Sequence, residues 1–270
     1  MTERRTTSRD GTHIAFERLG DGEPLILVSG ALQGRTTYRP LAEELSRHFT
    51  VWNYDRRGRG GSGDTAPYAV EREVDDLGAL IAEIGGTASV YGHSSGAGLI
   101  LHAAERGLPL DKIVLHEPPF GAGSDEERRA EQEEAEQISA LLAQDRRGEA
   151  IGFFLSSMGM PPEMVDHLSQ DPALLANAPT LRYDPFAVLS EQGRGGRTPV
   201  EQAGSVTTPA LVLVGEASPE WMIDAGTRIA DALPKGRLHV LEGQDHVVPP
   251  EVLAPVLAEF LSDHVVESQR

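Results

Sequence analysis

Short runs of apolar residues alternate with amphipathic stretches along most of the chain. The runs LILV at 25–28 and LVLV at 211–214 are continuously apolar, as expected of strands that are buried on both faces of a sheet. Leucine and phenylalanine recur at helical spacing after the first run, at Leu41, Leu45 and Phe49. An alternation of such strands and helices predicts an α/β fold with a mostly parallel sheet.

The same two patterns account for most other parts of the chain. Residues 13–30 are predicted to form two strands joined by an Asp-Gly turn, because apolar runs flank the turn. Further strands are predicted at 50–55, 88–92, 112–119, 209–215 and 236–243. Amphipathic helices are predicted at 41–49, 70–85, 97–107, 219–233 and 254–264.

Strand patterns are absent between residues 120 and 207. A very polar helix is predicted there after Ser124, a favourable N-cap residue that is followed by acids in the first turn. Because the strand–helix alternation returns at 208, we expect an α/β core of 1–119 and 208–270 and a helical cap of 120–207. A segment of this length is too long for an ordinary loop and is typical of a lid over a site.

Composition and charge exclude several classes of partner and several kinds of site for this chain. Its formal net charge of −18 disfavours nucleic acid and anionic membrane surfaces, since phosphate binding needs clustered Lys and Arg. The absence of cysteine excludes disulfides, thiolate metal sites and cysteine nucleophiles. The first 13 residues contain no apolar signal-peptide core, and the aliphatic runs are too short to span a bilayer. We therefore expect a cytoplasmic protein without metal or cofactor. The sequence leaves the oligomeric state open, a homodimer included.

The most informative motif is VYGHSSGAG at residues 90–98, where a strand pattern ends in glycines and serines. The frame G-x-S-x-G selects Ser94, because only this serine has a glycine two positions before and two positions after it. The sharp turn would hold Ser94 in a strained backbone conformation, with no room for side chains at the two glycine positions. The alternative is a glycine-rich turn that binds phosphate. Because G-x-G-x-x-G does not follow the first strand, we interpret Ser94 as a nucleophile.

A serine nucleophile needs a base, and His246 is the candidate. It lies in LEGQDHVV, between the last predicted strand and the last predicted helix. This position fits a triad in which serine, acid and histidine follow one another along the chain. The other histidines lie in polar surroundings, within a helix or at a strand end, where structural roles are expected.

The acid that would orient His246 has two candidate locations, each directly after a strand. After ALVLVG the expected position is occupied by Ser218, which carries no charge. The nearby carboxylates of Glu216, Glu220 and Asp224 are out of register. After KIVLH comes Glu117, which two prolines follow at the carboxyl edge of the sheet. We favour Glu117 over a carboxylate near Ser218.

An oxyanion hole requires two backbone N–H groups that point at the developing negative charge. Ser95, directly after the nucleophile, is expected to supply one of them. Ala31, in the loop SGALQG after the strand LILV, is expected to supply the other. In the glycine-rich loop DRRGRGGS, Asp55 and Arg57 are interpreted as residues that stabilise the loop.

Together these motifs resemble those of the α/β-hydrolases. The matching parts are Ser29-Gly30, DRRGRGGS at 55–62, the elbow around Ser94, GEASP at 215–219 and EGQDH at 242–246. The resemblance implies an eight-stranded, mostly parallel sheet with the helical cap inserted after strand six. The chain departs from the usual pattern at Ser29, where histidine is usual, and at Ser218, where aspartate is usual.

A closer resemblance is to the zearalenone lactonases, which carry a Ser-His-Glu triad. They have a similar SSGA elbow and a similar His-Glu-x-Pro stretch after strand six, which LHEPP matches here. This resemblance places Glu117 on the glutamate of their triad and implies a lactone substrate. The lactonases also have a tryptophan in the cap, whereas Trp52 and Trp221 both lie outside the cap of this chain.

These expectations lead to a functional hypothesis. The chain is expected to be a serine hydrolase that cleaves an ester or lactone of a hydrophobic small molecule, such as a zearalenone-like macrolactone, through an acyl-enzyme. Its substrate pocket is expected to include Phe153, Met158, Tyr183 and Trp221, since methionine and aromatic side chains suit a bulky apolar ligand. The alternatives are a perhydrolase without cofactor, a carbon–carbon bond hydrolase, and a member of the fold that only binds a ligand or promotes its cyclisation.

Overall fold

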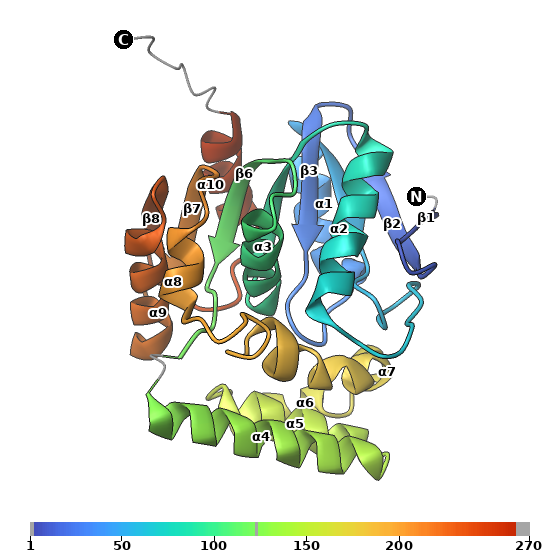
Figure 1. Ribbon diagram of the computed structural model, residues 1–270, viewed down its shortest axis with the longest axis vertical. Helices are drawn as coiled ribbons and strands as arrows, with labels where there is room; N and C mark the ends of the chain where they lie inside the picture. Colours follow the sequence, from blue (N-terminus) through green and yellow to red (C-terminus); the bar gives the residue numbers. More distant parts are fainter. Residues whose placement is uncertain (1–2, 122–123, 263–270) are drawn as a thin grey trace.

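A computed structural model of the chain describes residues 3–121 and 124–262 and contains an eight-stranded sheet (Figure 1). The strand order is β1-β2-β4-β3-β5-β6-β7-β8, with β1 and β2 antiparallel to their neighbours and the other pairs parallel. This confirms the predicted α/β fold with its mostly parallel sheet. The strands are β1 Arg4–Thr7, β2 His13–Leu19, β3 Glu23–Val28, β4 Phe49–Tyr54, β5 Ala88–His93, β6 Leu110–His116, β7 Ala210–Gly215 and β8 Gly236–Leu241.

Helices cover both faces of the sheet, which explains why its central strands are apolar throughout. On β3, Leu25 and Leu27 pack against the helices of one face, and Ile26 and Val28 pack against those of the other. One face is covered by α1 (Arg35–Leu45) and α10 (Pro250–Ser262). The other face is covered by α2 (Val70–Ile84), α3 (Ser95–Glu105) and α9 (Glu220–Ala232).

The segment after β6 is helical, as predicted, and lies across the carboxyl ends of the strands (Figure 1). Four of its helices surround a small apolar core of their own, which includes Ile138, Ile151 and Leu181 and also receives Leu32 from the loop after β3. We call this part of the chain the cap. Its elements are α4 (Asp125–Ala143), α5 (Arg147–Ser157), α6 (Pro162–Leu168), α7 (Pro172–Asn177), η1 (Ala178–Arg182) and η2 (Asp184–Val188).

The last part of the predicted cap segment packs on the sheet instead of on the cap core. Val188, Ala203 and Val206 belong to the apolar cluster beneath α3 and α9. The short helix α8 (Pro199–Gly204), which begins with a capping box at Thr198, lies beside α9. The helices that share the separate apolar core are therefore those from α4 to η1.

Two local features differ from the sequence interpretation. The edge strand β1 has a polar sequence and no apolar alternation, so it was not predicted, yet it pairs with β2 along four residues. Helix α1 begins at Arg35, six residues before the apolar pattern at Leu41, because Tyr38 faces the core earlier in the helix. Both differences arise from pairing or packing with distant parts of the chain.

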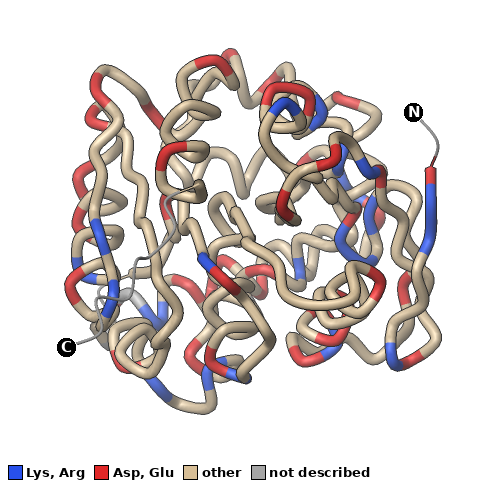
Figure 2. The backbone as a smooth tube through the Cα atoms, turned by 90° about the horizontal axis from the view of Figure 1, so that it is seen from above, with Lys and Arg blue, Asp and Glu red and all other residues tan. Residues whose placement is uncertain are grey.

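The excess of acidic residues is spread over the molecule and does not collect in one segment (Figure 2). Within the described residues, no helix is both long enough and apolar enough to cross a bilayer.

Two helical glycines offer opposite tests of this packing. At Gly226 in α9 a Cβ atom would overlap Val214 Cγ1 of β7, whereas at Gly78 in α2 a Cβ atom would meet no atom within 4 Å. We expect Gly226→Ala to lower the free energy of unfolding by about 1–3 kcal/mol through overpacking. Gly78→Ala should raise it by about 0.5–1 kcal/mol, because alanine restricts the unfolded chain and favours the helix.

Urea unfolding measures both effects. In the double variant Gly226→Ala/Val214→Ala, the loss should be smaller than the sum of the two single losses, because removal of the valine methyl groups relieves the overlap. Additive losses would contradict this account of the α9–β7 contact.

Candidate active site

The turn after β5 places Ser94 at the entrance of α3. Ser94 is the N-cap residue of this helix and has φ 54° and ψ −123°, which is a strained conformation for a residue with a side chain. A Cβ atom on Gly92 would lie 2.5 Å from Ile100 Cδ1 and 2.6 Å from the carbonyl oxygen of Gly96. A Cβ atom on Gly96 would overlap the carbonyl oxygen of Val28 on β3. Both glycines of the motif are therefore required by close backbone approach.

The register of the sheet brings Glu117 beside Ser94. Strands β5 and β6 are parallel neighbours that pair His93 with His116, so Ser94 and Glu117 occupy the next position on each strand. The amide of Ser94 donates to the carbonyl of His116 at 2.8 Å. Glu117 also has positive φ, at 48°. Two adjacent strand ends thus direct functional side chains toward the same edge of the sheet.

The Glu117 carboxylate is fully buried and accepts three hydrogen bonds. Ser218 Oγ donates to Oε1 at 2.5 Å, and the amide of Gly215 donates to the same oxygen at 2.7 Å. The other oxygen, Oε2, contacts His246 Nδ1. Burial opposes ionisation of Glu117, but these three hydrogen bonds outweigh burial and hold its pKa below the ordinary value. Ser218 therefore donates a hydrogen bond to the predicted acid and does not take its place.

The loop that carries His246 closes over the end of β7. The amide of Ala217 donates to the carbonyl of Gln244 at 2.8 Å, and a Cβ atom on Gly215 would lie 2.5 Å from the same carbonyl oxygen. These contacts place His246, which is 129 residues from Glu117 in the chain, against the Glu117 carboxylate. The His246 side chain is 29% exposed, so it lies at the boundary between the core and solvent.

His93 supports this loop, a role that the sequence interpretation did not assign. Its Nε2 donates to the carbonyl of His246 at 2.9 Å, and the two rings lie 4.4 Å apart. Burial lowers the pKa of His93 well below its ordinary value and lowers the pKa of His116 to about 4. Both rings are therefore neutral near pH 7, and His246 is the histidine of this group that solvent reaches.

The predicted oxyanion loop lies against Ser94. A Cβ atom on Gly30 would lie 3.2 Å from Ser94 Cβ, so the loop backbone passes directly beside the serine. Ser95 is the first residue of α3, and its N–H therefore has no acceptor within the helix. Among the hydrogen bonds of the described residues, none involves the Ser94 hydroxyl, which faces a cavity.

This cavity has a volume of about 360 Å³ and lies between the cap and the edge of the sheet. It is bounded by Ser94, Ala31 and Ser95 on the sheet side. Its largest apolar side chains are those of Phe154, Met158, Leu189 and Trp221, and its acidic residues are Glu131, Glu134 and Asp184.

Of the four expected pocket residues, Met158 and Trp221 line this cavity. Phe153 does not, since it is 38% exposed and Phe154, the next residue on α5, faces the cavity in its place. Tyr183 is also elsewhere, because its ring stacks on Tyr68 at 3.8 Å. Helical periodicity alone did not show which of two neighbouring phenylalanines faces inward.

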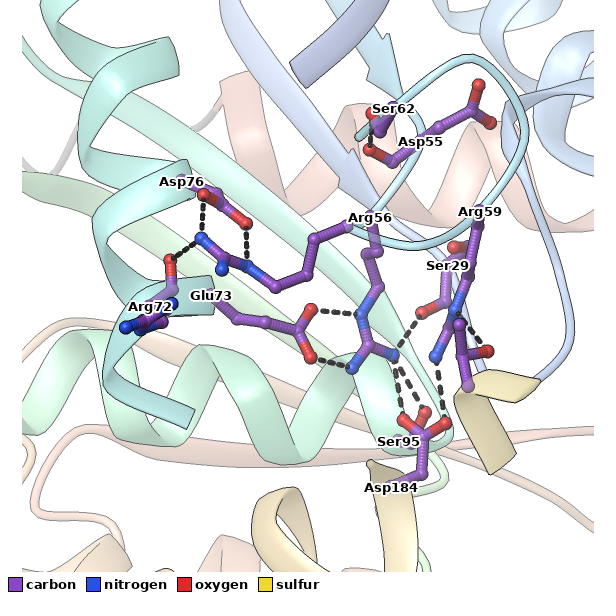
Figure 3. Close-up of polar contacts among 12 residues, drawn as sticks. Ser29, Asp55, Arg56, Arg59, Ser62, Arg72, Glu73, Asp76, Ser95 and Asp184 are labelled. Atoms are coloured by element: carbon purple, nitrogen blue, oxygen red, sulfur yellow. Dashed lines mark hydrogen bonds and ion pairs between the residues drawn. The ribbon is translucent and has the colours of Figure 1, made fainter. Parts of the chain in front are cut away.

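The loop DRRGRGGS forms a buried polar cluster next to the site (Figure 3). Asp55 accepts from the amides of Arg35 and Gly61, at 2.7 and 2.8 Å, which agrees with the predicted structural role. Arg57 pairs with Asp76 through two hydrogen bonds of 2.8 and 2.7 Å. In the described part of the chain, no three His, Asp or Glu side chains gather as a metal site would require.

Comparison with known sequences shows which family this chain resembles. A sequence model described as "Alpha/beta hydrolase family" matches residues 25–258. The N-formylmaleamate deformylase of Pseudomonas putida is 36% identical over 104 residues, which is 37% of this chain and 39% of that relative. The 2-(acetamidomethylene)succinate hydrolase of Mesorhizobium japonicum is 24% identical over 90% of this chain and 89% of its own length.

Solved structures show the same fold. An alpha/beta hydrolase from Sphaerobacter thermophilus is 44% identical, with a TM-score of 0.83 over 96% of this chain and 100% of that chain. An esterase from Thermogutta terrifontis is 24% identical, with a TM-score of 0.74 over 97% of this chain and 98% of that one. The enol-lactonase of Burkholderia xenovorans is 19% identical, with a TM-score of 0.70 over 96% and 100%.

The hydrogen bond from Ser218 to Glu117 predicts a pH-dependent loss of stability. A carboxyl group whose pKa is lowered in the folded state stabilises the fold above its unfolded pKa, and this contribution is lost as pH falls through the folded pKa. We expect Ser218→Ala to lower the free energy of unfolding by about 1–3 kcal/mol at pH 7, with a smaller effect at pH 4.

Urea unfolding at the two pH values checks this expectation. Ser46→Ala serves as the control, since Ser46 Oγ donates to the backbone carbonyl of Glu43 instead of to a carboxylate. If Ser218→Ala lowered the free energy of unfolding equally at pH 7 and pH 4, the stabilisation by Ser218 would not come from its hydrogen bond to an ionised Glu117.

Proposed function

Because this chain belongs to the alpha/beta hydrolase family, we propose that it is a serine hydrolase that cleaves a carboxylic ester or lactone of a neutral, hydrophobic small molecule. The observation that carries the proposal is the arrangement at one sheet edge. Ser94 stands on a strained turn facing a cavity, and the buried Glu117 carboxylate beside it contacts His246. These are the nucleophile, histidine and acid that acyl transfer to serine requires.

In the proposed reaction, Ser94 Oγ attacks the carbonyl carbon and its proton passes to Nε2 of His246. Glu117, bound to Nδ1 of the same ring, fixes the tautomer and stabilises the imidazolium that forms. The imidazolium then protonates the leaving alcohol, which departs from the tetrahedral intermediate. Water, activated by the neutral imidazole, hydrolyses the acyl-enzyme by the same steps. Proton transfer requires His246 to approach Ser94 when substrate is bound, since catalytic hydrogen bonds often tighten only in the complex.

The amides of Ala31 and Ser95 are the proposed donors to the oxyanion. Both residues border the cavity beside Ser94, and the N-terminus of α3 directs its partial positive charge to the same point. Each such donor is worth roughly 3 kcal/mol of transition-state stabilisation in comparable hydrolases.

The cavity wall favours an uncharged substrate. Among the described residues that line it, Glu131, Glu134 and Asp184 are charged, and no Lys or Arg is present. Asp184 is buried and paired with Arg56 and Arg59, so the two glutamates supply the negative charge that a ligand would meet. Its remaining large side chains are apolar. The relative from Mesorhizobium japonicum is named for a succinate, a dicarboxylate that would need cationic partners. We therefore propose a neutral ester or lactone as substrate here.

A zearalenone-like macrolactone is one candidate within this class. Its support is the sequence resemblance at the SSGA elbow and at Glu117, while the cap tryptophan of those lactonases has no equivalent in this cap. Serine at position 218, where aspartate is usual, is the one sequence feature that would favour a non-hydrolytic member of the fold. That feature no longer favours it, because Ser218 donates to the Glu117 carboxylate.

The roles of Ser94 and Glu117 can be tested with matched variants. We expect Ser94→Ala to lower kcat/KM for an aryl ester by several orders of magnitude, because the nucleophile is gone. Glu117→Gln should lower it by at least about 100-fold, whereas Glu216→Gln should leave it within about twofold, since Glu216 accepts from the amide of Gly243 on the loop surface.

Labelling with a fluorophosphonate separates a hydrolase from a ligand binder. The wild-type protein should be labelled at Ser94, and Ser94→Ala should not be labelled. A wild-type protein that neither reacts with the probe nor cleaves any ester or lactone in a broad screen would refute the proposed function.

The charge of the cavity predicts selectivity between substrates of equal size. We expect kcat/KM for 4-nitrophenyl butyrate to exceed that for mono-4-nitrophenyl succinate by at least about 10-fold, because the glutamates repel a second carboxylate. Glu134→Gln should narrow this difference and leave the neutral ester unchanged within about twofold. An equal or greater rate with the anionic ester would rule out the proposed preference for neutral substrates.

A further inference from the structure

The carbonyl of Gly30 accepts a hydrogen bond from Arg59 Nη1 at 2.5 Å. This carbonyl and the N–H of Ala31 belong to the same peptide group. Because a trans peptide is planar, its C=O and N–H point in opposite directions. An arginine that fixes the carbonyl therefore also fixes the direction of the N–H that we assign to the oxyanion hole.

A second arginine contacts both halves of the proposed oxyanion hole. Arg56 Nη1 donates to the carbonyl of Ser29 at 3.2 Å and to Ser95 Oγ at 3.0 Å. Ser29 begins the oxyanion loop, and Ser95 supplies the second amide. Arg56 therefore links the loop after β3 to the N-terminus of α3 through one guanidinium group.

Both arginines meet at one carboxylate that comes from the cap (Figure 3). Asp184, the first residue of η2, places Oδ2 2.8 Å from Arg59 Nη2 and Oδ1 3.0 Å from Arg56 Nη1. All three side chains are at most 1% exposed. Glu73 of α2 pairs with Arg56 as well, at 2.7 and 2.8 Å. In the part of the chain that the structure describes, Asp184 is the carboxylate paired with Arg59.

The Asp184 carboxylate offsets the cost of burying the charge of Arg59. Burial and the neighbouring Arg56 lower the pKa of Arg59, while Asp184 and Glu73 act in the opposite direction. Without the Asp184 charge, two adjacent buried guanidinium groups would share one carboxylate, and relaxation of Arg59 would release the Gly30 carbonyl.

We propose that Asp184 is a positioning residue of the oxyanion hole, through which docking of the cap orients the Gly30–Ala31 peptide by way of Arg59 and holds the Ser95 side by way of Arg56. This proposal rests on the proposed function, because it concerns donors that act on the tetrahedral intermediate. Because Asp184 acts through the two arginines, its loss should weaken stabilisation of the transition state more than it weakens the binding of a small ester.

The chain offers a matched control one residue along the same loop. Asp76 of α2 pairs with Arg57, and both side chains are as buried as those of the Asp184 cluster. Arg57 contacts Asp10, Asp76 and the carbonyl of Arg72, all of them away from the oxyanion loop and the elbow. Asp76→Asn therefore removes a comparable buried charge without touching the proposed hole.

The first experiment compares Asp184→Asn with Asp76→Asn, using 4-nitrophenyl acetate as a substrate too small to contact most of the cap. We expect kcat of Asp184→Asn to fall at least about 10-fold with KM within about threefold of wild type, because loss of a complete donor costs roughly 100- to 1,000-fold. Asp76→Asn should keep kcat within about twofold.

The affinity for a trifluoromethyl ketone inhibitor is a readout that would not change if Asp184 had only a structural role. Ser94 Oγ adds to its carbonyl carbon, the serine proton passes to His246, and the resulting oxyanion occupies the hole. Its affinity should fall in Asp184→Asn by about the same factor as kcat/KM, and should not fall in Asp76→Asn. If folded Asp184→Asn kept kcat and inhibitor affinity within about threefold of wild type, or if Asp76→Asn lost as much, the proposal would be overturned.

Two further measurements keep the test decisive. If Asp184→Asn does not fold, Arg59→Lys replaces it, since an ammonium group does not reproduce the planar fork that donates from Nη1 to the Gly30 carbonyl and from Nη2 to Asp184. The same loss of kcat is expected, and wild-type kcat would overturn the proposal.

If the wild-type protein has no esterase or lactonase activity, the proposed function fails first. The amide resonance of Ala31 in alanine-labelled protein then decides, because it should shift in Asp184→Asn and stay in place in Asp76→Asn.

Discussion

Close approach of backbones at the carboxyl edge of the sheet is the constraint on which the site depends. The turn after β5 runs so near to Val28 on β3 that position 96 has no room for a Cβ atom. At the same turn Ser94 adopts positive φ, and α3 begins at the next residue. The loop after β3 lies in contact with the Ser94 side chain. Parallel pairing of β5 with β6 then sets Glu117 at the neighbouring strand end. The positions of Ser94, Glu117 and the loop after β3 thus follow from one local packing arrangement.

Around this arrangement the protein buries an unusual amount of charge. Arg56, Arg57 and Arg59 are nearly inaccessible to solvent, and each is paired with a buried carboxylate. Buried ion pairs of this kind contribute little net stability, because desolvation offsets much of their attraction. What they do supply is a fixed geometry. Two of these arginines donate to carbonyl oxygens of the oxyanion loop, and the cap provides the acid that both contact.

The proposed triad acid follows a different strand from the one that usually carries it. The position after β7 that usually carries the acid holds Ser218, and the acid instead follows β6. Both strand ends lie side by side, so a carboxylate at either one can reach the histidine loop. In this chain the hydroxyl and the amide after β7 donate to the carboxylate that follows β6. The two locations that the sequence left as alternatives are parts of one hydrogen-bonded unit.

The sequence by itself determined the apolar strands of the sheet, the helical insertion and the candidate reactive residues at strand ends. Apolar runs, amphipathic periods and the glycine frame around Ser94 are local patterns, and local patterns are what a single sequence displays. The polar edge strand β1, the inward-facing Phe154 and the support that His93 gives to the His246 carbonyl were decided by tertiary contacts. Asp184 is the clearest case, since nothing near it in the sequence marks it, and its partners lie about 125 residues earlier in the chain. Only folding brings the cap against the glycine-rich loop, and a buried charge acquires its role from the charges that surround it.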